Sequence, residues 1–107
     1  MNDIKINILE FSEYPGPRYR NQGKNSGEEF FEDFLRLKFE EALNNNLKLI
    51  VDLDGAAGYA SSFLDEAFGR LVKLYGVESV KNTLVVISEE EKSWIDIIFN
   101  EILPQWS

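Results

Sequence analysis

The sequence predicts an α/β fold with a small mixed β-sheet and helices, in the order strand, loop, helix, strand, helix, strand, helix. Strand-like apolar segments at 4–11, 47–53 and 83–88 are the first observation. The second is that segments with apolar residues at helical spacing separate or follow them. The third is a length of 107 residues, which suits one hydrophobic core. We therefore expect residues 1–107 to form a single domain.

A half-buried strand is predicted at the beginning of the chain, where isoleucines at 4, 6 and 8 alternate with polar residues. The next segment, 13–27, is rich in proline and glycine and is predicted to be a long loop. After Glu13 this loop carries Arg18, Arg20 and Lys24 and no acid, in a chain of net charge −8. It is either a solvated surface loop or a site for a phosphate or an acidic partner.

The first helix is predicted to begin after Ser26, because Ser26 and Glu29 form the spacing of a capping box. Phenylalanines at helical spacing follow and indicate a core-facing stripe, and Asn44–Asn46 ends the helix. The near-continuous apolar run 47–53 then predicts a central strand that is buried on both faces.

The second helix is predicted to be capped by Ser61 or Ser62 and to end at Gly76, with Gly69 permitting close packing. A last strand at 83–88 should run parallel to the one before it, since a helix connects the two. Ser88 and Glu91 then predict the cap of a final helix that Pro104 ends.

Composition excludes several kinds of chemistry. The chain has no Cys and no His, so disulfides, thiol catalysis, imidazole bases and the usual zinc sites are absent, and we expect no metal and no cofactor. The charge of −8 argues against nucleic acid and anionic membranes as partners. No apolar run reaches the length of a membrane span, and the chain begins Met1-Asn-Asp-Ile, with an acid where a signal peptide would carry positive charge. We therefore expect a bacterial, cytoplasmic protein.

Two short motifs follow the central strand, Val51-Asp-Leu-Asp-Gly55 and Ala60-Ser-Ser-Phe63. They resemble the Asp-Leu-Ser-Gly-like turn and the Asp-Ser-Ser-Gly motif of STAS domains, the fold of bacterial anti-sigma-factor antagonists. More closely, the segment from Ser61 to Val72, with the Arg18 loop and Ser26-Gly-Glu-Glu-Phe30 upstream, is similar over roughly residues 10–90 to the STAS-like family of uncharacterised prokaryotic proteins. The resemblance implies a single STAS-like domain that is a non-catalytic regulatory or protein-interaction module.

In STAS antagonists a partner ATPase with a histidine-kinase-like fold phosphorylates the first serine of that motif and thereby turns partner binding off. By position this phosphoacceptor is Ser61, although Ala60 and Phe63 depart from the motif. We expect the partner-binding surface to comprise the residues around this serine and the basic loop, namely Gly58, Tyr59, Ser61, Ser62, Asp65, Glu66, Arg18 and Arg20. The alternative for both serines is a helix cap, and the alternative for Asp65 and Glu66 is dipole stabilisation of the first turn.

A second interpretation rests on Asp52-Leu-Asp54-Gly55, which resembles the first motif of haloacid-dehalogenase-type phosphatases. That resemblance implies a Mg²⁺-dependent phosphatase with Asp52 as nucleophile, Asp54 as acid and base, and Ser88 at the end of the next strand. No acidic pair follows a further strand to complete such a site, so both aspartates are expected to cap their loop or to contact the region of Arg18. We therefore expect no enzyme activity. The oligomeric state is left open.

Overall fold

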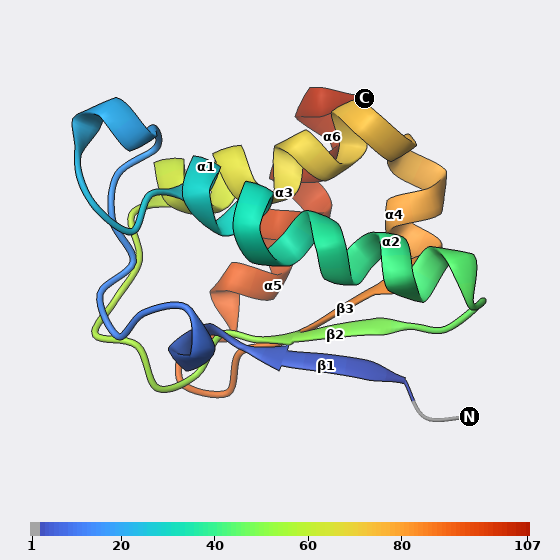
Figure 1. Ribbon diagram of the computed structural model, residues 1–107, viewed down its shortest axis with the longest axis horizontal. Coiled ribbons are helices and arrows are strands. Elements are labelled where there is room, and N and C mark those ends of the chain that lie inside the picture. The colour runs from blue at the N-terminus through green and yellow to red at the C-terminus, as the bar shows by residue number, and fades with distance from the viewer. Residues whose placement is uncertain (1–2) are drawn as a thin grey trace.

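The computed structural model describes residues 3–107 and contains a three-stranded sheet covered by helices on one side (Figure 1). The strands are β1 (Ile4–Asn7), β2 (Leu49–Asp52) and β3 (Leu84–Ile87), in the order β1-β2-β3. Both pairings are parallel, with Ile6 opposite Val51 and Val51 opposite Val86. The α/β class and the parallel pair β2-β3 are confirmed, but the described strands form a parallel sheet and not a mixed one.

The helices form three longer runs. The first consists of α1 (Gly27–Phe30), a π-helical turn at Phe31–Leu35 and α2 (Arg36–Asn44). The second is α3 (Ser61–Tyr75), which ends at Gly76 with φ of 86° and is followed by the unpredicted α4 (Val77–Thr83). The third consists of α5 (Ser93–Ile97), a π-helical turn at Ile98–Ile102 and α6 (Leu103–Trp106). Pro104 therefore does not end the helical run, because it lies at the start of α6, directly after the π-helical turn.

The sheet is buried on one face only. Leu49, Val51 and Val86 point toward the helices and are 0%, 0% and 7% exposed, whereas Val85 on the other face is 41% exposed. In Figure 1 the helices lie above the sheet, and within residues 3–107 no helix covers its lower face. The prediction that the central strand is buried on both faces is wrong. The apolar residue Ile50 of β2 lies on the outer face of the sheet, between Lys5 and Val85, and this face is open to solvent.

The core between the sheet and the helices is rich in phenylalanine, as the helical stripe predicted. Phe30 and Phe63 are almost completely buried and their rings are 5.7 Å apart, which joins α1 to the first turn of α3. Phe11, from the chain after β1, packs on Phe30 at 5.2 Å. Ser26 caps α1 by accepting a hydrogen bond from the Glu29 N–H at 3.0 Å, as predicted. These contacts fix the position of the α3 N-terminus, where the predicted site lies.

Candidate functional site

The first turn of α3 presents two serine hydroxyls. The helix begins at Ser61, and Ala60 is its N-cap residue, with extended φ and ψ of −85° and 139° and no side-chain cap. The prediction that Ser61 or Ser62 caps the helix is wrong, because the chain turns helical one residue earlier and the Phe63 N–H donates to the Ala60 carbonyl. Ser61 is exposed and Ser62 is half-buried. Neither hydroxyl forms a hydrogen bond within residues 3–107, so neither is used to hold the fold.

Arg18 lies beside these serines although the basic loop is distant in sequence. Residues from the loop, α3 and the C-terminal helices surround a surface hollow of about 280 Å³, namely Arg18, Ser61, Ser62, Asp65, Ile97, Glu101, Ile102 and Gln105. The loop reaches this place because the carbonyls of Pro17 and Arg18 accept hydrogen bonds from the first N–H groups of α1. The structure thus brings together four of the eight predicted partner-binding residues.

The charged groups of this region neutralise one another. The Arg18 guanidinium is 2.6 Å from Asp65 and 3.3 Å from Glu66, and the hydrogen bond to Asp65 is the main reason why the pKa of Arg18 is raised. Glu66 is only 2% exposed and also accepts a hydrogen bond from Arg70 at 2.5 Å. Asp65 and Glu66 therefore anchor the loop to α3, which was not among the roles expected for this pair.

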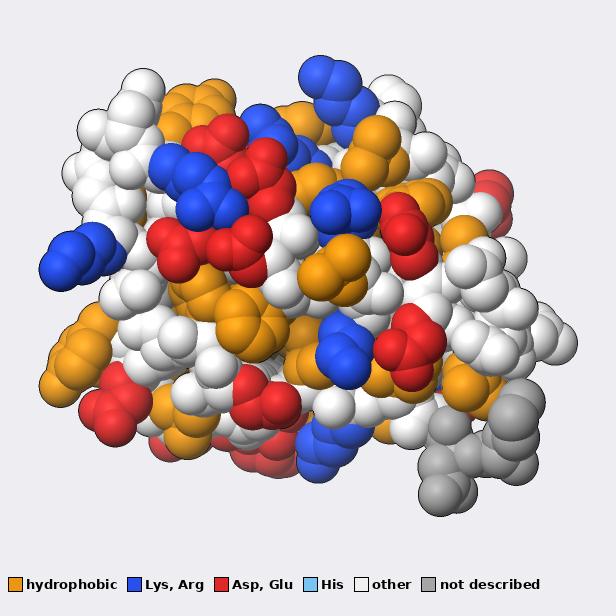
Figure 2. Space-filling model, viewed as in Figure 1, with side chains coloured by type: hydrophobic (Ala, Val, Ile, Leu, Met, Phe, Trp, Pro, Cys, Tyr) orange, Lys and Arg blue, Asp and Glu red, His pale blue; other side chains and the backbone are white. Residues whose placement is uncertain are grey.

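Arg20 belongs to a neighbouring cluster outside the hollow. Its guanidinium forms ion pairs with Glu32 at 2.9 Å and Asp33 at 3.1 Å, and Arg70 reaches Glu28 at 3.4 Å. Figure 2 shows basic and acidic side chains interleaved over α1 and the preceding loop. Of the basic residues of the loop, Arg20 is thus paired with the helical run that follows it, and Arg18 with α3.

The Asp-x-Asp-Gly turn fastens two loops to each other. The two Asp54 carboxylate oxygens accept hydrogen bonds from the N–H groups of Glu89 and Glu90, at 3.1 Å and 3.0 Å. Asp52 accepts one from the N–H of Asp54 and lies 3.9 Å from Lys5. The expectation that the aspartates cap their loop is confirmed for Asp52, whereas Asp54 caps the 88–91 loop after β3. Neither contacts Arg18 among the described residues. No group of three acidic side chains within residues 3–107 is placed to hold a metal ion.

Ser88 is not the helix cap that the sequence predicted. It is 3% exposed, and its hydroxyl donates to the Glu91 carbonyl at 2.6 Å instead of capping a helix. The last helical run begins at Ser93, beyond the predicted capping box. Ser88 therefore closes the tight 88–91 turn that brings the acidic residues after β3 toward the loop after β2.

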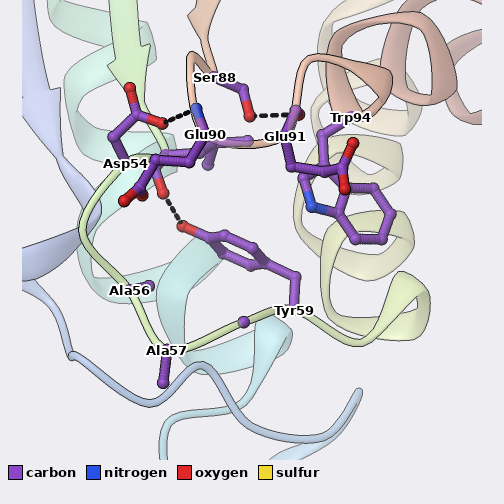
Figure 3. Close-up of a pocket in the computed structure, with 10 residues that line it drawn as sticks. Asp54, Ala56, Ala57, Tyr59, Ser88, Glu90, Glu91 and Trp94 are labelled. Atoms are coloured by element: carbon purple, nitrogen blue, oxygen red, sulfur yellow. Dashed lines mark hydrogen bonds between the residues drawn. The ribbon is translucent and has the colours of Figure 1, made fainter.

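A second hollow, not predicted from sequence, lies between these two loops at the carboxyl ends of β2 and β3 (Figure 3). Its volume is about 220 Å³. Its walls combine acidic, aromatic and small residues with one leucine, namely Leu53, Asp54, Ala56, Ala57, Gly58, Tyr59, Ser88, Glu90, Glu91 and Trp94. Ligands of open parallel sheets commonly bind outside the carboxyl ends of the strands. Since the sequence predicted β2 and β3 as parallel neighbours, the residues that follow both strands were a usable signal for this hollow.

Tyr59 forms the centre of this hollow. Its hydroxyl donates to the Leu53 carbonyl at 2.6 Å, and its ring lies 6.2 Å from the Trp94 indole at an angle of 75°. Burial, followed by the negative charges of Asp54, Asp52 and Glu90, raises the pKa of Tyr59 far above the usual value. The Tyr59 phenol is therefore uncharged and held in place, and the electrostatic potential at its hydroxyl is negative.

Comparison with protein families identifies the fold. Residues 26–94 match the sequence model of a family described as a STAS-like domain of unknown function. The chain belongs to this family. The matched part of the STAS-like domain contains β2, α3, α4 and β3, and with them both serines, Asp65, Glu66, Gly58 and Tyr59. Arg18, Arg20 and β1 precede it, and Trp106 follows it.

The resemblance seen in the sequence is thereby confirmed for the family and the fold class. No curated protein and no solved structure matches this chain at a significant level. None of the helices within residues 3–107 is both long and apolar enough to cross a bilayer.

Proposed function

We propose that this STAS-like domain is a non-catalytic regulatory module that binds a protein partner through the start of α3 and the loop before it. We further propose that a partner ATPase of histidine-kinase-like type phosphorylates Ser61 and so switches this binding, in the bacterial cytoplasm. The observation that carries the proposal is the Ser61 hydroxyl, which is exposed at the first residue of α3 and forms no hydrogen bond within residues 3–107. A side chain that the fold does not need is available for modification.

The position of Arg18 supports a switch at this serine. A phosphate on Ser61 would add about two negative charges in the hollow that Arg18 and Asp65 also line. Arginine forms strong charge-assisted hydrogen bonds to phosphate. Because Arg18 now pairs with Asp65 and Glu66, a phosphate would compete for a guanidinium that anchors the loop. Asp65 and Glu101 would repel the phosphate, so phosphorylation would rearrange the ion pairs at the start of α3.

The phosphatase alternative has less support. An aspartyl nucleophile and its acid/base partner need carboxylate oxygens that reach a substrate. Both oxygens of Asp54 accept backbone hydrogen bonds, and Asp52 is used by the Asp54 N–H and by Lys5. The arrangement serves loop closure, and this favours the binding module.

Partner capture from native cells tests the proposal. We expect the tagged domain to capture a partner ATPase, and Ser61→Glu to reduce the captured amount at least about tenfold, because it adds charge to the docking surface. Ser61→Ala should still capture the partner but accept no phosphate when ATP is added, as read by mass spectrometry. Asn82→Glu, which adds the same charge on the exposed side of α4, is the matched control and should bind normally.

Two results would contradict the proposal. One is equal partner capture by the wild type and Ser61→Glu. The other is ATP-dependent phosphate at another residue while Ser61 stays unmodified. Hydrolysis of phosphoesters that is lost in Asp52→Asn would instead support the enzyme alternative.

A further inference from the structure

The hollow at the carboxyl ends of β2 and β3 contains acidic side chains that the rest of the fold does not neutralise. Asp54, Glu90 and Glu91 line it, and none of the three forms an ion pair with Lys or Arg within residues 3–107. The acids around α1 and the start of α3 behave differently, because Glu66 and Glu28 each pair with arginine. No basic side chain lines the hollow. Its net charge therefore favours a cation.

The aromatic walls indicate what kind of cation fits. Tyr59 and Trp94 stand nearly perpendicular at 6.2 Å, and Figure 3 shows Asp54 and Glu90 on the hydroxyl side of Tyr59, with Glu91 beside the indole. The faces of Trp and Tyr rings attract organic cations, especially guanidinium groups. A metal ion would need oxygen ligands converging on one point, and the acids within residues 3–107 form no such group. The chemistry thus fits an organic cation better than a metal ion.

Size and position narrow the occupant further. The hollow, at about 220 Å³, is smaller than the roughly 300–1,000 Å³ of pockets that enclose drug-sized molecules. It has room for one long side chain. Gly58 and Tyr59 belong both to its wall and to the proposed docking surface, and the loop that they form leads directly into the first turn of α3. A protein that docks on α3 therefore lies within reach of this hollow.

We propose that the hollow binds an arginine or lysine side chain of the partner protein. This inference rests on the proposed function for the partner, while the affinity of the hollow for a cation is independent of it. The guanidinium or ammonium group lies against Tyr59 and Trp94, and the carboxylates of Asp54, Glu90 and Glu91 balance its charge. The charge of the hollow thereby selects a partner with a basic residue at this place.

NMR titration of the ¹⁵N-labelled domain with N-acetyl-arginine methylamide tests the cation site without the partner. We expect the Trp94 indole N–H signal to shift saturably, with a dissociation constant on the order of millimolar for such a small ligand. N-acetyl-citrulline methylamide has the same shape without the charge and should bind about fivefold or more weakly. The Trp106 indole donates to Asp65 outside the hollow and is the internal control that should not move.

Matched variants separate the hollow from the general negative charge of the surface. Glu90→Gln and Glu91→Gln keep an acceptor oxygen for the Gly55 N–H and the Ser93 hydroxyl, and each should weaken arginine amide binding about two- to fivefold. Tyr59→Leu should weaken it by a similar factor through loss of the ring. Glu89→Gln removes the same charge from a residue outside the hollow and should leave binding unchanged. Equal binding of citrulline and arginine amides, or equal effects of Glu89→Gln and Glu91→Gln, would overturn the cation site.

Partner capture then separates failure of the inference from failure of the proposed function. We expect the Glu90→Gln, Glu91→Gln double variant to lose most of the captured partner ATPase, while Glu89→Gln retains it. A partner that is lost in Ser61→Glu but retained in the double variant would overturn the inference alone. Specific arginine amide binding, together with partner capture that is unaffected by Ser61→Glu, would overturn the proposed function and leave the cation site standing.

Discussion

Gly69 lets the Trp106 side chain of α6 pack directly against α3. Gly69 is buried within α3, and a Cβ there would overlap the Trp106 indole. The indole N–H donates to Asp65 at 3.0 Å, and Asp65 in turn holds Arg18. The close packing that the sequence predicted for Gly69 therefore joins the C-terminal helix and the N-terminal loop to one turn of α3.

The sign of the change in unfolding free energy on Gly69→Ala tests this contact. Alanine normally stabilises a helix interior by about 1 kcal/mol relative to glycine, but overpacking costs about 1–3 kcal/mol. We expect the single variant to lower the free energy of unfolding by up to about 2 kcal/mol in urea denaturation. In a Trp106→Ala background the same change should instead raise it by about 0.5–1 kcal/mol. A single variant more stable than the wild type would show that the indole moves aside freely.

The two helix starts at the site differ in their caps. Ser26 is fully buried and its hydroxyl accepts the Glu29 N–H, whereas Ala60 at the start of α3 has no side chain for that purpose. The first N–H groups of α3 are thus not satisfied by a side-chain cap. In this family member the helix start that carries Ser61 is the less stabilised of the two, although α3 extends over 15 residues.

Replacing the caps should shift stability in opposite directions. We expect Ser26→Ala to cost about 1–2 kcal/mol, since it removes a cap and leaves a buried N–H unpaired. Ala60→Ser should gain about 0.5–1 kcal/mol, because residue 60 already has the extended conformation of an N-cap. Urea denaturation of both variants at the same pH measures the difference. No gain for Ala60→Ser would mean that the exposed N–H groups are already satisfied by water.

At the scale of the whole molecule, the helices bury only one face of the parallel sheet. Most parallel sheets are covered on both faces, and their strands are then apolar throughout. Here Lys5 and Asp52 border the open face, while Ile50 and Val85 remain on it. Stability should accordingly depend on alternate residues of each strand.

Adjacent valines of β3 test this one-sided core. Val86 is 7% exposed and Val85 is 41% exposed. We expect Val86→Ala to lower the free energy of unfolding by about 1–3 kcal/mol through the lost burial and the cavity, and Val85→Ala to lower it by less than about 1 kcal/mol. Thermal and urea denaturation check the pair. Equal losses would indicate that the outer face is covered in solution, for instance by a second copy of the chain.

Local sequence patterns predicted the elements because strand and helix periodicity are properties of neighbouring residues. The cap at Ser26, the break at Gly76 and the apolar strands at 49–52 and 84–87 were all readable in this way. The burial of β2 on both faces was predicted wrongly, because an apolar outer residue such as Ile50 looks the same whether or not a layer covers it. Whether a face of the sheet is covered depends on where the helices cross it, and local residue spacing carries no information about this.

The site was less predictable because its contacts join distant segments. Arg18 and Asp65 are 47 positions apart, and the Gly55 N–H finds Glu90 at a separation of 35. Sequence placed Ser61 and Arg18 in one surface, and the structure brings both to the same hollow. The sequence could not show that arginines would neutralise Asp65 and Glu66 but not Glu90 and Glu91. That distinction depends on which loops touch.

The arginine network has a consequence for how the domain responds to its solution conditions. Arg18, Arg20 and Arg70 hold the loop, α1 and α3 together by ion pairs, most of them partly exposed to solvent. Dissolved salt screens such pairs but strengthens apolar packing slightly or leaves it unchanged. We therefore expect rising ionic strength to loosen the end that carries Ser61 more than the end where Phe39 packs on Tyr75.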